Sequence, residues 1–313
     1  MANSKRPIIV IAGPTASGKS DLGIELALRF NGEIINSDSV QVYCRLYIAT
    51  AKVPPNEQRG IPHHLIDIVE PTENFTAGDF SRLASEKIAE IESRGKLVLL
   101  VGGTGFYLRA LFGGLFEGTP TDPLLRQRVH RILQRKGPVH LHKMLSRVDP
   151  TAASRISAND WSRTTRALEV IFQTGESISI QQQRMPEPPE FARRVHFFVL
   201  NPPREALYEK INRRDDEMFA AGLVDEVRAL LESGMPRDAK AFGAHGYRRV
   251  VAYLHGEITL EECIEQTKID TRHYAKRQLT WWRNQAKPMW LNEFGSDPAI
   301  IEQAAKCVGS LLS

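Results

Sequence analysis

The stretch Gly13-Pro14-Thr15-Ala16-Ser17-Gly18-Lys19-Ser20 decides the fold. It matches G-x-x-x-x-G-K-[S/T], the pattern of a phosphate-binding loop. The run before it, Pro7–Ala12, is apolar and rich in β-branched residues, as a buried parallel strand requires. After Lys19 the apolar residues follow helical spacing. A strand, a glycine-rich turn and a helix in this order direct backbone N–H groups and the positive helix end to one point. The sequence therefore predicts a site for a diphosphate or triphosphate.

All eight residues of this loop are predicted to bind the diphosphate or nucleotide: Gly13, Pro14, Thr15, Ala16, Ser17, Gly18, Lys19 and Ser20. Lys19 supplies a positive charge, and the Ser20 hydroxyl is a natural ligand for Mg²⁺, the cofactor that we expect. The alternative is a glycine-rich turn that binds nothing. The strand and helix that flank the loop argue against that alternative.

Composition indicates an ordinary soluble globular protein of 313 residues, with 42% apolar and 25% charged residues. No apolar run approaches the roughly 20 residues that span a bilayer, so we expect no membrane association. The apolar N-terminal run passes directly into the phosphate loop, which favours a core strand over a signal peptide. The three cysteines are far apart in sequence, which predicts reduced thiols in a cytoplasmic protein. We expect a monomer.

Two further strands are predicted to end near the phosphate loop. The run Glu33–Ser37 leads to Asp38, and Lys96–Val101 leads to Gly102-Gly103-Thr104. In doubly wound sheets, ligands sit beyond the carboxyl ends of the strands, so Asp38 is predicted to face the ligand. A turn or helix-cap aspartate is an equally good interpretation. A strand that ends in glycines and a threonine is unlike the acid-terminated strand of nucleotide-driven motors.

A basic segment interrupts the α/β pattern. Residues 124–166 carry ten Lys or Arg against two acidic residues, a net charge of +8 that leaves the rest of the chain at −4. Such a concentration favours a polyanionic partner, although a solvated helical face is the alternative. The simplest organisation is a P-loop α/β core, residues 1–118 and 193–313 with C-terminal helices, interrupted by a helical insertion, residues 119–192.

The C-terminal part is predicted to be helical, and Asp270–Asn284 interleaves basic and aromatic side chains. Such a helix suits phosphate contact and base stacking. The alternative is that Tyr274 and Trp282 belong to the core, and we expect the two functions on opposite faces.

These motifs together resemble one family, the bacterial tRNA dimethylallyltransferases, from about Pro7 to Trp282. The motifs that carry the resemblance are Gly13–Ser20, Asp38-Ser-Val-Gln41-Val-Tyr43, Gly102-Gly-Thr-Gly105-Phe-Tyr107-Leu-Arg109, Gly246-Tyr247-Arg248 and Arg272-His-Tyr-Ala-Lys276-Arg277-Gln278-Leu-Thr-Trp281. The resemblance implies transfer of a dimethylallyl group from dimethylallyl diphosphate to N6 of adenosine 37 in the tRNA anticodon loop, with release of diphosphate.

The chemistry fits these residues. The adenine exocyclic nitrogen is a poor nucleophile, and a carboxylate that takes or orients its proton would help, a role for Asp38. The leaving diphosphate needs stabilised negative charge, which Lys19, the loop and, by resemblance, Arg214 would provide. Thr104 would hold the substrates, and the target base must flip out of the anticodon stack.

Residues assigned to tRNA binding come from the family motifs and the basic stretches: Asp38, Ser39, Val40, Gln41, Thr104, Arg126, Ser162, Arg163, Thr164, Thr165, Arg166, Gly246, Tyr247, Arg248, Lys276, Arg277, Trp281 and Arg283. The chain departs from the family pattern over Cys44–Val53, where Arg-Gly-Met-Asp-Ile-Gly-Thr-Ala-Lys-Pro is usual, and at Arg249, where Glu or Gln is usual. Two other functions remain as alternatives: a P-loop kinase acting on a nucleoside, and a nucleotide-gated RNA-binding protein.

Overall fold

The computed structural model describes residues 6–113, 122–184, 187–285 and 288–313. Two compact units make up the chain, a larger one of residues 1–112 and 190–313 and a smaller one of residues 113–189. The junction expected at 118–119 lies outside the described residues. Among the described residues, no helix is both long enough and apolar enough to cross a membrane.

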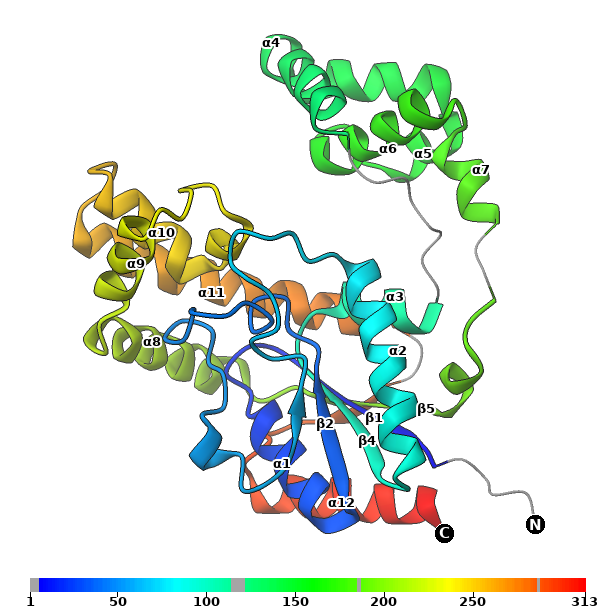
Figure 1. The fold of residues 1–313 in the computed structure, drawn as a ribbon, viewed down its shortest axis with the longest axis vertical. Coiled ribbons are helices and arrows are strands. Elements are labelled where there is room, and N and C mark those ends of the chain that lie inside the picture. Colours follow the sequence, from blue (N-terminus) through cyan, green and yellow to red (C-terminus); the bar gives the residue numbers. More distant parts are fainter. Residues whose placement is uncertain (1–5, 114–121, 185–186, 286–287) are drawn as a thin grey trace. The chain divides into compact units, whose positions relative to one another are not determined.

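A six-stranded sheet forms the centre of the larger unit (Figure 1). Every strand pairing in it is parallel, which confirms the predicted α/β core. In spatial order the strands are β3 (His63–His64), β2 (Gly32–Asn36), β4 (Leu97–Val101), β1 (Ile8–Ala12), β5 (Val195–Leu200) and β6 (Met289–Leu291).

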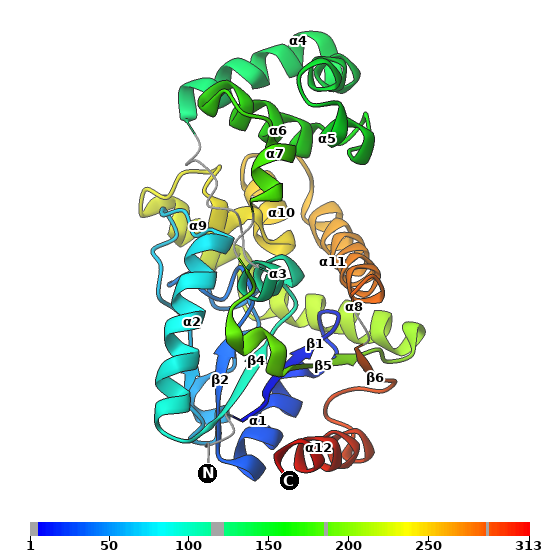
Figure 2. The same ribbon diagram turned by 90° about the vertical axis from the view of Figure 1, so that its right-hand side faces the viewer.

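Helices cover both faces of this sheet (Figures 1 and 2). One face carries α1 (Lys19–Phe30) and α12 (Pro298–Leu312), whose apolar side chains share one core with β1, β2 and β4. The other carries α2 (Ala77–Ser93) and α3 (Gly105–Gly113). β1, β2 and β4 are buried along their whole length, and the continuous apolar runs of β1 and β4 are the pattern that a doubly covered parallel sheet requires.

Four further helices pack beside the carboxyl ends of the strands. They are α8 (Arg204–Ala220), α9 (Leu223–Glu232), α10 (His245–Leu254) and α11 (Leu260–Arg283). The capping box of Thr259 and Glu262 starts α11 ten residues before the segment predicted from its basic and aromatic pattern. Trp282 is 1% exposed, so this residue does belong to the core.

The smaller unit is entirely helical within its described residues. It contains α4 (Pro123–Val148), α5 (Pro150–Arg155), α6 (Trp161–Thr174) and α7 (Ile178–Gln183). The predicted Gly137-Pro138 break is present: Gly137 has a φ of 76° and interrupts α4. Val129, Leu141 and Leu168 are among the apolar side chains of this unit's own core.

A buried carboxylate joins two helices of the smaller unit. Glu169 on α6 is fully buried. Arg126 on α4 grips it with two hydrogen bonds, Nε to Oε1 at 2.7 Å and Nη2 to Oε2 at 3.1 Å. Arg166 approaches the same carboxylate at 3.5 Å. Two of the arginines assigned to tRNA therefore also balance a charge inside the fold.

Replacing Arg126 by methionine is expected to destabilise this unit more than replacing Glu169 by methionine. Arg126→Met leaves a buried carboxylate with only the more distant Arg166, whereas Glu169→Met leaves two partly exposed arginines that water can solvate. We expect Arg126→Met to lower the free energy of local unfolding by about 2–3 kcal/mol. Hydrogen–deuterium exchange of the α6 amides measures this, and an equal or larger loss in Glu169→Met would contradict it.

Candidate active site

The shape of the phosphate loop depends on the backbone conformation of Gly18 and on contacts within and around the loop. Gly18 caps α1 with a φ of 84°, a left-handed conformation that strains other residues. A Cβ at this position would also lie 2.9 Å from the backbone nitrogen of Gly295. Lys19 folds back and donates from Nζ to the Pro14 carbonyl at 2.7 Å. The Ser17 hydroxyl is buried without a hydrogen-bond partner among the described residues. The loop therefore offers donors that a phosphate would satisfy.

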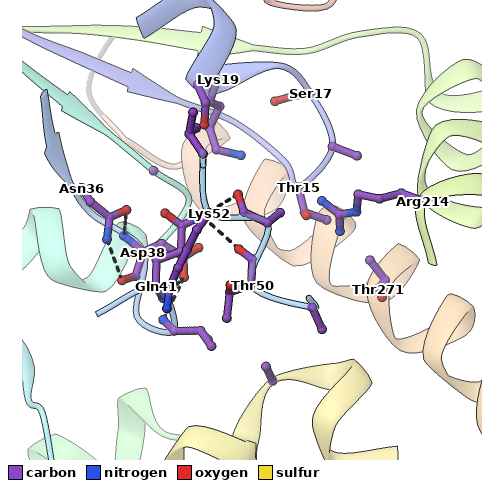
Figure 3. Close-up of a pocket in the computed structure, with 18 of the residues that line it drawn as sticks. Thr15, Ser17, Lys19, Asn36, Asp38, Gln41, Thr50, Lys52, Arg214 and Thr271 are labelled. Carbon is purple, nitrogen blue, oxygen red and sulfur yellow. Dashed lines mark hydrogen bonds between the residues drawn. The ribbon is translucent and has the colours of Figure 1, made fainter. Parts of the chain in front are cut away.

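These residues line a cavity of about 500 Å³ (Figure 3). Its walls come from the loop after β1, the turn after β2, the segment Ala49–Pro54 and the inner faces of α8 and α11. Lys19, Asp38 and Arg214, predicted from distant parts of the sequence, all line it. At the end of β4, Val101 and Gly102 line the cavity, and Thr104 is not among the described residues that do.

Two desolvated cations dominate the electrostatics of the cavity. Burial lowers the pKa of Lys19 to about 8, against the opposing attraction of Asp38. Burial also lowers the pKa of Arg214, whose Nε has no hydrogen-bond partner among the described residues. The neighbouring carboxyl group of Asp215 is 1% exposed, and burial raises its pKa to about 6. An anion bound here would compensate charges that the protein leaves poorly solvated.

The Asp38 side chain stabilises the turn that follows β2. Its Oδ1 accepts hydrogen bonds from the backbone N–H groups of Val40 at 2.8 Å and Gln41 at 3.3 Å. Within the described chain, Oδ2 accepts none. The turn-aspartate interpretation is therefore confirmed, and one carboxylate oxygen remains for substrate.

Thr104 connects this turn to the end of β4. Its hydroxyl oxygen accepts from the Ser39 N–H at 3.1 Å, and its own N–H donates to the Ser37 carbonyl at 3.3 Å. The Tyr274 phenol on α11 interacts with the Thr104 side chain. Burial and the charge of Asp38 raise the Tyr274 pKa, so this hydroxyl keeps its proton. Thr104 is thus placed to fix the Asp38 turn, and its contact with a substrate stays a prediction.

The loop that departs from the family pattern is anchored by Lys52. Its Nζ donates to the carbonyls of Tyr43 and Leu46, each at 2.6 Å, and pairs with Asp67 at 2.5 Å. Gln41, assigned to tRNA, donates from Nε2 to the Thr50 carbonyl at 3.0 Å. The Asp67 carboxylate is therefore paired with Lys52.

Three of the residues assigned to tRNA are core residues. Tyr247 is 0% exposed; its hydroxyl donates to Glu226 at 2.5 Å and accepts from the Ala49 N–H at 3.3 Å. Thr164 and Thr165 on α6 are 0% and 3% exposed. Their side chains pack inside the protein and are not on its surface, and their assignment to tRNA binding stays a prediction. Gly246, also buried, lines the cavity.

Other residues assigned to tRNA remain accessible. On the larger unit, Ser39, Val40 and the half-buried Trp281 accompany the exposed residues Arg248, Lys276, Arg277 and Arg283. On the smaller unit, Ser162 is exposed and the Arg163 side chain is 72% exposed. Each of these assignments stays a prediction.

The cavity fits a magnesium ion only in combination with a phosphate ligand. Among the described residues, no group of three His, Cys, Asp or Glu side chains could hold a metal. Ser20, in the first turn of α1, lines the cavity, and so does Asp38. A Ser ligand completed by phosphate oxygens and water is a usual arrangement for Mg²⁺.

Sequence reasoning left Gln278 of α11 without a role. It is 5% exposed and lines the cavity between the phosphate loop and the end of β4. The helical spacing of Tyr274 and Gln278, four residues apart, is the one signal in the sequence that places both on one face.

Comparison with known proteins identifies relatives over nearly the whole chain. A family model described as IPP transferase matches residues 41–285. A tRNA dimethylallyltransferase from Solibacter usitatus is 47% identical over 98% of this chain and 99% of its own. The crystal structure of a full-length tRNA isopentenylpyrophosphate transferase from Bacillus halodurans is 40% identical, with a TM-score of 0.73 and coverage of 98% and 97%. Crystal structures of a eukaryotic dimethylallyltransferase acting on tRNA give 34% identity and a TM-score of 0.74, covering 88% of this chain and 69% of theirs.

Binding of diphosphate is expected to weaken as the pH rises through about 8, the pKa of Lys19 in the free protein. Below this pH Lys19 is already protonated; above it, binding must take up a proton, so affinity falls by up to about tenfold per pH unit. Titration calorimetry with inorganic diphosphate on both sides of this pH measures the effect. The Lys19→Arg variant stays charged and corrects for the titration of diphosphate itself. A pH-independent ratio of the two affinities would exclude this role for Lys19.

Proposed function

The chain belongs to the IPP transferase family, and we propose that it transfers a dimethylallyl group from dimethylallyl diphosphate to N6 of adenosine 37 in the anticodon loop of tRNA. Like its relatives it is an enzyme, a tRNA prenyltransferase. The observation that carries the detailed proposal is the joint placement of Asp38, Lys19 and Arg214 around one cavity. This arrangement sets a carboxylate opposite the cations that would receive a leaving diphosphate.

Asp38 acts on the nucleophile in this proposal. The N6 nitrogen forms a bond to C1 of the allylic donor, and the bond between C1 and the diphosphate oxygen breaks. The proton lost from N6 passes to Asp38, whose Oδ2 is not used by the turn. The donor's electron pair leaves on the diphosphate.

Lys19, Arg214 and the phosphate-loop N–H groups would stabilise that leaving group. Their charges and dipoles are already in place before reaction, which is the most effective form of electrostatic catalysis. Ser20 would help to hold Mg²⁺, which would supply further positive charge for the leaving diphosphate. The buried Ser17 hydroxyl is available as an additional donor.

The tRNA would contact basic residues of both units. Exposed basic residues of α11, Lys276, Arg277 and Arg283, suit the phosphates of the anticodon loop. The basic helices of the smaller unit suit the backbone of the anticodon stem. The target base must leave its stack to reach Asp38.

The kinase alternative shares the phosphate loop and a carboxylate at Asp38. It gives no role to the basic insertion, and the relatives that cover this insertion are tRNA dimethylallyltransferases. The two activities separate in one assay: incubation with tRNA and radiolabelled dimethylallyl diphosphate. We expect label on tRNA that carries adenosine at positions 36 to 38. Unlabelled tRNA together with ATP-dependent phosphorylation of a nucleoside would refute the proposal.

The Asp38→Asn variant is expected to lose turnover and retain tRNA affinity. Asparagine keeps an oxygen that can accept from the Val40 and Gln41 N–H groups, so the turn persists, but it cannot take the N6 proton. We expect kcat to fall about 10²- to 10⁴-fold while the tRNA Kd changes by less than about threefold. Single-turnover kinetics and filter binding measure the two quantities. A large loss of tRNA affinity would identify Asp38 as an anchor and not a base.

Arg163 offers a test of the insertion that does not disturb its core, because its side chain is 72% exposed. If it contacts a phosphate, Arg163→Gln should lower the slope of log affinity against log salt for tRNA by about 0.7–0.9. Arg29→Gln, in the last turn of α1 far along the chain from the basic segment, is the matched control. An unchanged slope in Arg163→Gln would show that this residue does not touch the tRNA backbone.

A further inference from the structure

Gln278 bridges two walls of the cavity that are distant in sequence. Its Oε1 accepts a hydrogen bond from the Thr15 N–H of the phosphate loop at 2.8 Å. Its Nε2 donates to the carbonyl of Gly103, at the end of β4, at 3.1 Å. One partner only donates and the other only accepts, so an amide satisfies both in a single orientation.

The fit at this bridge is tight. A Cβ on Gly103 would lie 2.0 Å from Nε2 of Gln278, so no larger residue is compatible with the bridge. Glycines after a strand can let the backbone approach a ligand closely. At Gly103 the close neighbour is a side chain of the protein itself.

The bridge continues to the catalytic turn. Tyr274, one helical turn before Gln278, interacts with both Gln278 and Thr104. The Thr104 hydroxyl in turn accepts a hydrogen bond from the N–H of Ser39, the residue after Asp38. One face of α11 therefore contacts the loop that would hold the diphosphate and the turn that would hold the base.

We propose that Gln278 is a positioning residue that fixes the separation between the diphosphate-binding loop and the Asp38–Thr104 turn. This rests on the proposed function, because displacement at C1 requires N6 and the leaving diphosphate to be aligned on opposite sides of the carbon. A misplacement of about 1 Å can cost about 10²-fold in rate. Gln278 needs no contact with either substrate to exert this effect.

The Gln278→Leu variant removes both hydrogen bonds at similar side-chain volume. We expect kcat at saturating tRNA to fall about 10- to 10²-fold, with the tRNA Kd changed by less than about threefold. Cys263→Ala is the control, since Cys263 is fully buried in the same helix and does not line the cavity. Equal losses of kcat in the two variants, or a loss confined to tRNA affinity, would overturn the proposal.

The Gln278→Glu variant adds a readout that a merely structural role would not move. When protonated, the introduced carboxyl group can accept from Thr15 and donate to Gly103; when ionised, it repels the Gly103 carbonyl. Burial favours the protonated form. The ratio of its kcat to that of the wild type should therefore rise about tenfold as the pH falls from about 8 to about 6, whereas the ratio for Gln278→Leu stays flat. A flat ratio for Gln278→Glu would overturn the proposal.

Failure of the proposed function is distinguishable from failure of the bridge. Wild-type protein that leaves tRNA unlabelled would refute the first. The second is then tested by calorimetry with inorganic diphosphate, whose affinity should fall about tenfold in Gln278→Leu and stay unchanged in Cys263→Ala. Equal affinities in both variants would overturn the bridge.

Discussion

The parallel register of β1, β4 and β2 is the constraint on which the site depends. Val101 at the end of β4 pairs with both Ile11 of β1 and Asn36 of β2, so the three strands end at almost one level. Their connections therefore emerge side by side at one edge of the sheet: the phosphate loop, the glycine turn and the Asp38 turn. No contact between side chains is needed to bring these three segments together, since hydrogen bonding between the strands already does so.

The register alone leaves the charges of the site unbalanced. Lys19 and Arg214 lie in a cavity that lowers the pKa of both, and Asp38 and Asp215 oppose them with two carboxylates. Burial raises the Asp215 pKa to about 6, so this carboxyl group is only moderately acidic. Such a cavity is costly to the free protein and favourable for a diphosphate, which is the preorganisation that electrostatic catalysis requires. The smaller unit also buries a charge, but there the Glu169 carboxylate is paired with Arg126 and Arg166.

Local patterns in the sequence predicted much of this arrangement. Apolar runs located β1 and β4, and the short run Glu33–Ser37 located β2. The phosphate loop and the Asp38 turn follow from short motifs with a physical mechanism. What the sequence could not reveal depends on contacts between distant residues. Gln278 and Thr15 are hydrogen-bonded although 263 positions separate them in the sequence. The strand β6 has only three residues and is defined by its pairing with β5. Tyr247 and Thr164 look polar enough for a surface, yet tertiary packing buries them.

The departures over Cys44–Val53 illustrate which property of this loop matters. The Glu226 carboxylate accepts hydrogen bonds from the backbone N–H groups of Tyr47 and Ile48, at 3.1 Å and 3.2 Å. These two hydrogen bonds do not depend on the side chains of Tyr47 and Ile48. Arg45 stands where the family has glycine, and its φ of 64° lies in the left-handed region, at a cost of about 1–2 kcal/mol for a residue with a Cβ. Its guanidinium donates to the Ser233 hydroxyl at 2.8 Å, a contact that glycine cannot make and that offsets part of the strain. The loop therefore keeps its path because Lys52 and Glu226 hold its backbone, while Leu46 anchors it in the core.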